Sequence, residues 1–370
     1  MGKYTAVNDP SAHFQVFTYT GNGSHPRNLT NDGNSDLKPD LIWVKNLSDN
    51  GTNHVLANST MGFDAPNAPN GGGQLATDSS GGVNTPTATY GYVSAALTDG
   101  FTTAAGGTNG DTCNANAKEF VAWQWKANGG TTSSNTDGNI TATVQANPSA
   151  GFSIVFYTGD GTQTGKTVGH GLGAVPKMII SKDRDGTSNV ATWRTYHEGI
   201  GNTKYLQMPQ NDAASTFNDW DNTTPTSSVY SVGGAGGYTP TNTNNTEYIA
   251  YVFAEVQGYS KIGTYTGNNN ANGPFVYCGF KPAWIMVKKT SGVGDWRCWD
   301  FKRGVNGSTK RIRLNATDDQ DSGFDHLEIL SNGFKLRSTS SSSNSSGDFI
   351  FLAFAKNPFV TSTGIMGTAR

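Results

Sequence analysis

The sequence predicts an all-β protein made of three tandem antiparallel β-sandwich domains of a jelly-roll-like kind. The composition indicates many short strands joined by tight turns, because 47 of the 370 residues are glycine and only 15% are charged, and glycine readily adopts the positive φ angles of such turns. No window has the apolar spacing of an amphipathic helix, whereas runs such as FQVFTYT, FSIVFYT and FIFLAFA are short and rich in aromatic and β-branched residues. Sequence motifs also recur three times in the same order, which predicts repeated units.

The repeated motifs mark the beginning, the middle and the end of each predicted domain. They are Tyr-Thr-Gly starting at Tyr19, Tyr157 and Tyr265; a proline-led apolar run ending at Lys45, Lys182 and Lys288; the segments Leu97–Phe101 and Leu330–Phe334, matched more loosely by Ser228–Gly233; and closing strands that start at Phe120, Tyr248 and Phe349. The tyrosines are 138 and 108 residues apart, which is the length of a domain and not of a solenoid repeat. We therefore expect three domains that superpose.

These motifs set the predicted boundaries. The domains span residues 1–130, 151–258 and 259–370, and residues 131–150 form a linker whose only large apolar residues are Ile140 and Val144. At this length each domain is expected to bury a modest core of its own, without a single large core. The closing strands are apolar at consecutive positions, which predicts a central place in a sheet that is buried on both faces. The short connection after Ala254 predicts that domains two and three pack as a rigid pair.

Charge and hydropathy exclude several classes of partner. The formal net charge of −2 gives no long-range field for nucleic acid. No run of eighteen apolar residues is present, and the first residues, MGKYTAVNDPSAH, lack an apolar signal core, so neither membrane insertion nor ordinary secretion is expected. We expect synthesis in a reducing cytoplasm. The odd number of cysteines (Cys113, Cys278 and Cys298) does not suit a disulfide framework, although a Cys278–Cys298 bridge is an alternative.

No catalytic or metal-binding motif is apparent, so an enzyme is not expected, and neither is a cofactor or a metal. The glycine-rich segment at 159–167 lacks the spacing and the following helix of a phosphate loop. The acidic clusters at 183–186 and 318–321 are the only candidates for calcium, but neither continues into a full ligand loop. Solvated turns are the favoured interpretation of both. No strand carries the paired carboxylates that a glycosidase needs.

Aromatic residues are the remaining candidates for a binding site. They could stack on sugar rings, but buried aromatic side chains also dominate small β cores, and that competing interpretation is favoured overall. The candidate sugar-binding residues are Trp193 and His197 in the second domain, with Trp296, Arg297 and Trp299 in the third. Because the third domain has the densest mixture of aromatic and charged residues, we expect any glycan contact to lie there.

Taken together, the motifs resemble an uncharacterised repeat module of bacteriophage tail-fibre and other virion-appendage proteins. The resemblance covers nearly the whole chain and rests on Tyr19–Gly23, Pro39–Lys45, Asn53–Val55, Asp99–Phe101 and Val121–Lys126. The module is considered similar to concanavalin-type sandwich lectins, and no catalytic residues are established for it.

The resemblance implies a non-enzymatic virion structural protein on the particle surface: a tail fibre, a capsid fibre or a decoration protein. Its implied partners are other virion proteins, two further copies in a homotrimer, and a host-surface polysaccharide. The alternatives are a shell-stabilising decoration protein without a receptor role, and a secreted carbohydrate-active enzyme or lectin.

Overall fold

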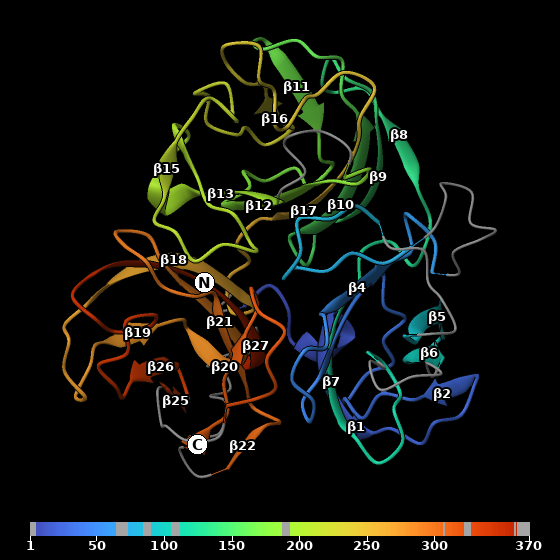
Figure 1. The fold of residues 1–370 in the computed structure, drawn as a ribbon, viewed down its shortest axis with the longest axis vertical. Coiled ribbons are helices and arrows are strands. Elements are labelled where there is room, and N and C mark those ends of the chain that lie inside the picture. The colour runs from blue at the N-terminus through green and yellow to red at the C-terminus, as the bar shows by residue number, and fades with distance from the viewer. Residues whose placement is uncertain are drawn as a thin grey trace.

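The computed structural model describes residues 5–63, 73–83, 90–104, 112–186, 193–305, 308–321, 327–358 and 360. As predicted, the described chain is all-β, with only two short 3-10 helices, η1 (Pro10–Ala12) and η3 (Glu198–Ile200). Its antiparallel sheets form three groups around a common centre (Figure 1). We call these groups the first, second and third unit, in chain order. No helix among the described residues has the length and apolar character needed to cross a bilayer.

Each unit has one larger sheet with the same central arrangement of three strands. In the first unit the order is β1 (Phe14–Thr20), β7 (Glu119–Trp125), β3 (Leu41–Asn46) and β4 (Val55–Asn58). In the second it is β13 (Trp193–His197), β12 (Met178–Asp183), β17 (Glu247–Phe253), β10 (Phe152–Thr158), β9 (Ala142–Asn147) and β8 (Ser133–Asn135). In the third it is β18 (Ser260–Gly267), β27 (Gly347–Pro358), β20 (Phe280–Lys289), β21 (Arg297–Asp300) and β24 (Ile312–Arg313).

A smaller sheet covers the outer face of each larger one. The first unit has β2 (Arg27–Leu29), β6 (Phe101–Ala104) and β5 (Tyr92–Ala96); the second has β11 (Lys166–Gly169) with β16 (Val229–Val232); the third has β19 (Phe275–Tyr277), β26 (Gly333–Leu336) and β25 (Leu327–Leu330). Two further pairs are β14 (Lys204–Tyr205) with β15 (Ser215–Thr216), and β22 (Gly304–Val305) with β23 (Ser308–Thr309).

The closing strands β7, β17 and β27 are buried on both faces, as their sequences predicted. Successive side chains of a strand point to opposite faces. In β7, Val121, Trp123 and Trp125 therefore point to the centre of the molecule, while Phe120 and Ala122 point toward the small sheet of the first unit. The strands β17 and β27 divide their side chains in the same way.

The inward faces of the three larger sheets meet in one shared core, so the prediction that no single large core forms was wrong. The ring of Trp284 in the third unit lies 6.1 Å from that of Trp123 and 5.7 Å from that of Trp125 in the first. Phe253 of the second unit lies 6.0 Å from Phe354 of the third. All three units therefore pack together. Each unit retains a second, smaller core between its own sheets.

The segment 131–150, predicted as a linker, instead contributes two strands to the second unit. Strand β9 pairs along β10, with Gln145 opposite Ile154, and β8 pairs with β9. Val144 and Ala142 enter the core of the second unit. The prediction failed because small residues can fill a position between two sheets, where bulky side chains have no space.

The three motif tyrosines lie in corresponding strands, as the repeat predicted. Tyr19 pairs with Phe120, Tyr157 with Tyr248 and Tyr265 with Phe349, and each of these ring pairs is stacked. Each hydroxyl donates to a backbone carbonyl, with lengths of 2.6, 2.7 and 2.6 Å, at Cys113, Thr241 and Ser343 respectively. The phenol is thus satisfied inside the core.

A buried asparagine follows each of these carbonyl residues and was not recognised from the sequence. Asn114, Asn242 and Asn344 each accept the backbone N–H of the residue three positions after the motif tyrosine. Their side-chain amides donate back to the same loop. One asparagine therefore closes the Tyr-Thr-Gly turn in every unit.

Three buried lysines join each unit to the next in the same direction around the centre. Lys45 donates to the backbone carbonyl of Thr317 at 3.2 Å, Lys182 to that of Ser80 at 3.1 Å, and Lys288 to that of Asp212 at 2.7 Å. Burial lowers the pKa of each lysine to about 8. These are the lysines that end the repeated apolar runs, so that motif marks contacts between units.

A buried ion pair inside the second unit predicts a pH effect on stability. The carboxylate of Asp219 lies 3.7 Å from Arg194, whose guanidinium packs on the ring of Tyr205. Burial raises the pKa of Asp219 to about 6 from 3.8, against the opposing effect of Arg194. A carboxyl with a raised pKa binds its proton more tightly in the folded state, so it adds stability below pH 4 that is lost as pH rises through 6.

Asp219→Asn should remove this contribution. A shift of two pKa units corresponds to roughly 3 kcal/mol. We therefore compare the free energies of unfolding of the wild type and the variant. The wild-type value minus the variant value should fall by up to that amount between pH 4 and pH 7. Buried His197, whose pKa is lowered to about 4, acts in the opposite direction and cancels in this difference. Urea titrations across the pH range provide the measurement, and parallel pH profiles would contradict the prediction.

Candidate functional site

The tryptophans and the histidine proposed as sugar contacts are all buried, so that proposal was wrong for them. Trp193, Trp296 and Trp299 are fully inaccessible and His197 is 1% exposed. Trp193 and Trp296 lie in the shared core, where their indole N–H groups donate to the carbonyls of Ala76 and Gln207 in the neighbouring unit. Trp299 fills the core of the third unit. Trp193 and Trp296 therefore hold units together, and none of the four side chains has a surface for a ligand.

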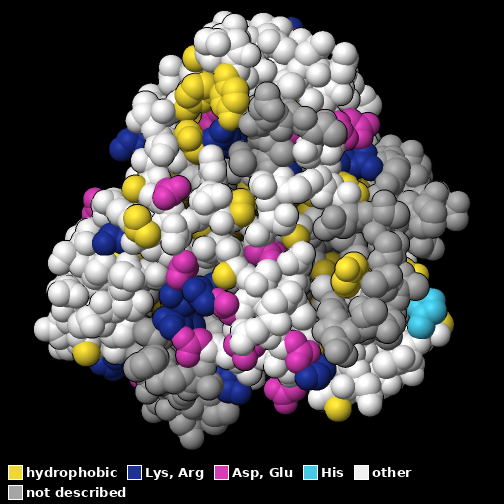
Figure 2. All heavy atoms as spheres, viewed as in Figure 1, with side chains coloured by type: hydrophobic (Ala, Val, Ile, Leu, Met, Phe, Trp, Pro, Cys, Tyr) yellow, Lys and Arg dark blue, Asp and Glu magenta, His cyan; other side chains and the backbone are white. Residues whose placement is uncertain are grey.

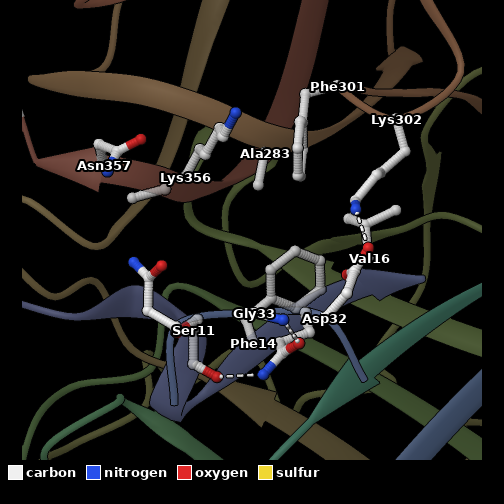
Figure 3. Close-up of a pocket in the computed structure, with 13 residues that line it drawn as sticks. Ser11, Phe14, Val16, Asp32, Gly33, Ala283, Phe301, Lys302, Lys356 and Asn357 are labelled. Carbon is white, nitrogen blue, oxygen red and sulfur yellow. Dashed lines mark hydrogen bonds and ion pairs between the residues drawn. The ribbon is translucent and has the colours of Figure 1, made fainter. Parts of the chain in front are cut away.

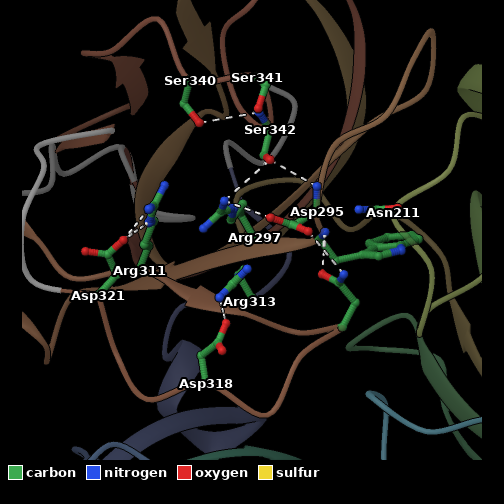
Figure 4. Close-up of polar contacts among 12 residues, drawn as sticks. Asn211, Asp295, Arg297, Arg311, Arg313, Asp318, Asp321, Ser340, Ser341 and Ser342 are labelled. Carbon is green, nitrogen blue, oxygen red and sulfur yellow. Dashed lines mark hydrogen bonds and ion pairs between the residues drawn. The ribbon is translucent and has the colours of Figure 1, made fainter. Parts of the chain in front are cut away.

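Arg297, the fifth candidate, is also mostly buried and belongs to a network of ion pairs. It donates to Asp295 at 2.8 Å, and Ser342 lies beside it. The neighbouring Arg311 and Arg313 pair with Asp321 and Asp318, respectively (Figure 4). Figure 2 shows basic and acidic side chains gathered together over the third unit, without a patch of one sign. Each charge has a partner within the network, which favours a structural role over anion binding.

The acidic clusters considered for calcium have partners within the protein. Asp318 and Asp321 form the ion pairs just described. Asp183 accepts the backbone N–H groups of Asp185 and Gly186, which makes it a turn cap. Within the described part of the chain, no three His, Cys, Asp or Glu residues form a group that could hold a metal. The three cysteines are buried free thiols.

The centre of the molecule offers no ligand site. A cavity lined by all three units, including Trp43, Trp193 and Trp284, has a volume of only about 20 Å³ and no polar surface. A void of this size holds at most one water molecule, and a void with apolar walls is expected to stay dry. This cavity is therefore too small for a ligand.

An exposed pair of aromatic side chains lies on the outer face of the small sheet in the third unit. Phe275 and Tyr277 are 45% and 59% exposed, although they flank Val276, which is buried in the core of that unit. Because they are two positions apart in β19, both project from the same face. Tyr277 lies against Gly279, where an added Cβ would come within 3.5 Å of the tyrosine hydroxyl. That is an ordinary contact, and glycine is favoured at this position by its positive φ of 80°.

The neighbouring strands surround the two rings with a polar rim. Lys335 of β26 lies opposite Phe275, and Glu328 of β25 lies opposite Lys335. Glu328 accepts a hydrogen bond of 2.8 Å from Arg337, which fixes the position of its carboxylate. We call Phe275, Tyr277, Lys335, Glu328 and Arg337 the aromatic platform. It presents two apolar ring faces beside hydrogen-bonding groups.

The corresponding positions of the other two units carry no aromatic residue. The buried residue of the equivalent strand is Leu29 in the first unit and Val168 in the second, each opposite the aromatic residue of its partner strand. The residues on either side of this buried residue are Asn28 and Thr30 in the first unit, and Thr167 and Gly169 in the second. The sheet therefore forms without aromatic residues at these positions. Phe275 and Tyr277 are therefore not required for this sheet to form.

Comparison with known families gives an assignment without a function. A model for a family described as Domain of unknown function (DUF7483) matches residues 9–358. The chain belongs to this family. No curated protein and no solved structure matches the chain.

In this DUF7483 protein, the sequence located the strand of the aromatic platform without revealing its exposure. The run FVYCGF was recognised as a strand of the third domain. Its alternation places Phe275 and Tyr277 on one face and Val276 on the other, but alternation alone does not say which face meets the core. The available signal was the comparison between repeats, because only the third copy has aromatic residues on both sides of the buried position.

Proposed function

We propose that this protein is a non-enzymatic virion surface protein whose third unit binds a carbohydrate through the aromatic platform. The observation that supports this most strongly is the exposure of Phe275 and Tyr277 at positions where the other two units have small or polar residues. This proposal places the glycan contact in the third unit, as the sequence predicted, but at different residues.

The chemistry of the aromatic platform suits a sugar chain. A pyranose has an apolar face of C–H groups that can lie on an aromatic ring, and its hydroxyls need hydrogen-bonding partners at the edge. Phe275 and Tyr277 would supply two neighbouring stacking surfaces, and Lys335 and Glu328 would supply a donor and an acceptor within the same sheet. Hydrogen bonds from charged groups are stronger than neutral ones, so this rim would orient the sugar.

The virion location follows from the resemblance to phage appendage modules, together with a proposed architecture of three tandem β-sandwich copies. The equivalent tyrosines, asparagines and lysines of the three units support the tandem copies. A purely structural decoration protein is the second candidate, and it predicts no saturable glycan binding. A secreted carbohydrate-active enzyme predicts release of products from a bound glycan.

The test is a glycan-array screen followed by titration of the selected glycan. Phe275→Ala and Tyr277→Ala should each weaken binding by at least about tenfold, equivalent to 1.4 kcal/mol. The unfolding midpoint should stay close to that of the wild type, because substitutions at exposed positions change stability little. Tyr90→Ala is the matched control, since Tyr90 is 57% exposed on the first unit and its loss should leave affinity unchanged.

The proposal fails if no glycan binds saturably, or if both platform variants bind as the wild type does. The expected homotrimer stays a separate prediction, to be measured by light scattering. The three units of one chain already bury the shared core among themselves, so a trimer of chains would have to form through other surfaces.

A further inference from the structure

The three seams between neighbouring units are filled differently. In the seam between the second and first units, β9 lies along the edge of β10, and the Gln145 side chain of β9 donates to the hydroxyls of Ser59 and Thr60 at 2.9 and 2.8 Å. Ser59 and Thr60 directly follow β4. An extended segment thus completes the sheet of one unit and contacts the next unit at the same time.

The seam between the first and third units has corresponding walls, but no such segment is found there among the described residues. Val16 of β1 corresponds to Ile154 of β10, because the motif tyrosine follows each of them by three positions. Phe301 and Lys302 follow β21 as Ser59 and Thr60 follow β4. A cavity of about 220 Å³ lies between these walls. Figure 3 shows Phe14 and Val16 on one side of it, with Ala283, Phe301 and Lys356 on the other.

The edge of β1 offers backbone groups to this cavity. The carbonyl of His13 accepts a hydrogen bond from Lys126, and the N–H of Gly21 donates to the carbonyl of Lys118, both at the ends of β7. The backbone groups of successive residues point to opposite sides of a strand. The N–H groups of Phe14, Val16 and Thr18 therefore point away from β7. Within the described part of the chain, these three amides form no hydrogen bond. Unpaired groups on a strand edge are a template for another strand.

The corresponding edge in the third unit is capped, which makes the open edge of β1 distinctive. There the N–H of Ile262 in β18 donates to the carboxylate of Glu255 at 3.2 Å, and the N–H of Ser260 donates to the carbonyl of Val256 at 2.9 Å. Thr264 also packs against Gly199 of the second unit. Of the three equivalent edges, one is paired with β9, one is capped, and that of β1 is open in the described structure.

Basic side chains lie around the β1 cavity. Lys302 and Lys356 line it, and Lys281 lies opposite Asn357 in the adjoining strands. Lys302 pairs with Asp32 across the seam (Figure 3), whereas the ion pairs of the described residues do not include Lys281 or Lys356. The cavity mouth therefore has excess positive charge. Residues 359–370, which follow the strand beside the cavity, contain no aspartate or glutamate and do not match this charge.

We propose that the seam between the first and third units is a docking groove for an extended acidic segment of another protein, which adds antiparallel to β1 as β9 adds to β10. Backbone hydrogen bonds to Phe14, Val16 and Thr18 would give the affinity, as in other cases of strand addition. Alternate side chains of the segment would face the seam, as Gln145 of β9 does, and acidic side chains would meet Lys281 and Lys356. This inference is independent of the aromatic platform.

The test uses a labelled synthetic peptide with the sequence ATVQANDD, which is that of β9 followed by two aspartates, and measures fluorescence anisotropy with the full chain. Saturable binding is expected, weakening severalfold as ionic strength rises because exposed charges are screened. A peptide with prolines at the positions of Thr143 and Gln145, APVPANDD, should not bind, because the N–H groups at these positions point toward the neighbouring strand and proline has no N–H to donate. A neutral peptide ending in two asparagines should bind more weakly, and equal affinity would overturn the acidic assignment.

Two protein variants locate the site. Thr18→Pro removes one outward N–H at an exposed position without affecting the bonds to β7, and should reduce affinity at least tenfold. Lys356→Gln removes a positive charge that lies 4.3 Å from the centre of the Phe301 ring, and should reduce affinity for the acidic peptide more than for the neutral one. No binding up to about 1 mM, the limit of weak specific association, or unchanged binding by a folded Thr18→Pro variant, overturns the proposal. Binding only to a chain truncated after Pro358 also overturns it, because the groove would then be occupied by the chain's own end.

Discussion

A fragment containing only residues 131–258 is expected to be unfolded at 25 °C, although it includes every strand of the second unit. The fragment would expose the whole inward face of its larger sheet, including Phe152, Trp193, Tyr251 and Phe253, which are buried in the intact chain by the other two units. Burying one large apolar side chain stabilises a fold by about 1.5–3 kcal/mol. Exposing these four removes roughly 6–12 kcal/mol, which is comparable to the whole stability of about 5–15 kcal/mol that a typical domain has.

Circular dichroism and the dispersion of amide signals in NMR spectra provide the measurement for this fragment, with the intact chain as the positive control. A matched variant of the fragment, with Tyr251→Lys and Phe253→Glu, tests the reason. If exposed apolar surface is the cause, this variant should be more soluble than the parent fragment, even if it does not fold. A parent fragment that unfolds cooperatively from a native-like state would contradict the shared core.

Trp284→Ala is expected to destabilise the intact chain by about 3–5 kcal/mol, which is the usual cost of removing a buried tryptophan. Trp284 lies where the units meet, with its ring 6.4 Å from that of Trp43, 6.1 Å from Trp123 and 6.1 Å from Phe354. The cavity would open between sheets of two units, so we expect weakened coupling between units as well as a lower unfolding midpoint.

Differential scanning calorimetry distinguishes these effects. The wild type should unfold in one transition, because the units share a core, and Trp284→Ala should lower and broaden it. Trp299→Ala is the matched control, since Trp299 is equally buried but lies in the core of the third unit alone, and it should lower the midpoint without separating the units. A loss below 1 kcal/mol for Trp284→Ala would contradict the central role of this residue.

The repeat could be recognised from the sequence because its motifs satisfy requirements that do not depend on neighbours. A tyrosine whose hydroxyl bonds to a buried carbonyl, as Tyr19 bonds to Cys113, recurs wherever the same turn is built. The strand character of the closing segments was likewise predictable, since their run of apolar residues suits a strand buried on both faces. The linker prediction failed at Ala142 and Val144, because a strand of small residues has no bulky apolar signature.

The residues predicted to contact a glycan are buried, and the proposed site in the third unit uses different ones. Trp296 and Trp299 have the composition of a sugar-binding surface, yet both are buried. Phe275 and Tyr277 lie in a strand that was recognised, and their exposure depends on the register between β19 and β26. Composition reports which side chains can stack on a sugar, but it does not report which of them reach solvent.

The sequence by itself determined that this protein is all-β, that related segments occur three times, and where the principal strands of each copy begin and end. These features depend on local alternation and turn chemistry, which are encoded within a few neighbouring residues. Only the tertiary structure decided that the copies face one another across a shared core and that Lys45, Lys182 and Lys288 join successive units. It also decided that no described segment pairs with the outer edge of β1. Such contacts join residues far apart in the chain, and an apolar side chain has the same local sequence pattern whether it packs within its own unit or against another.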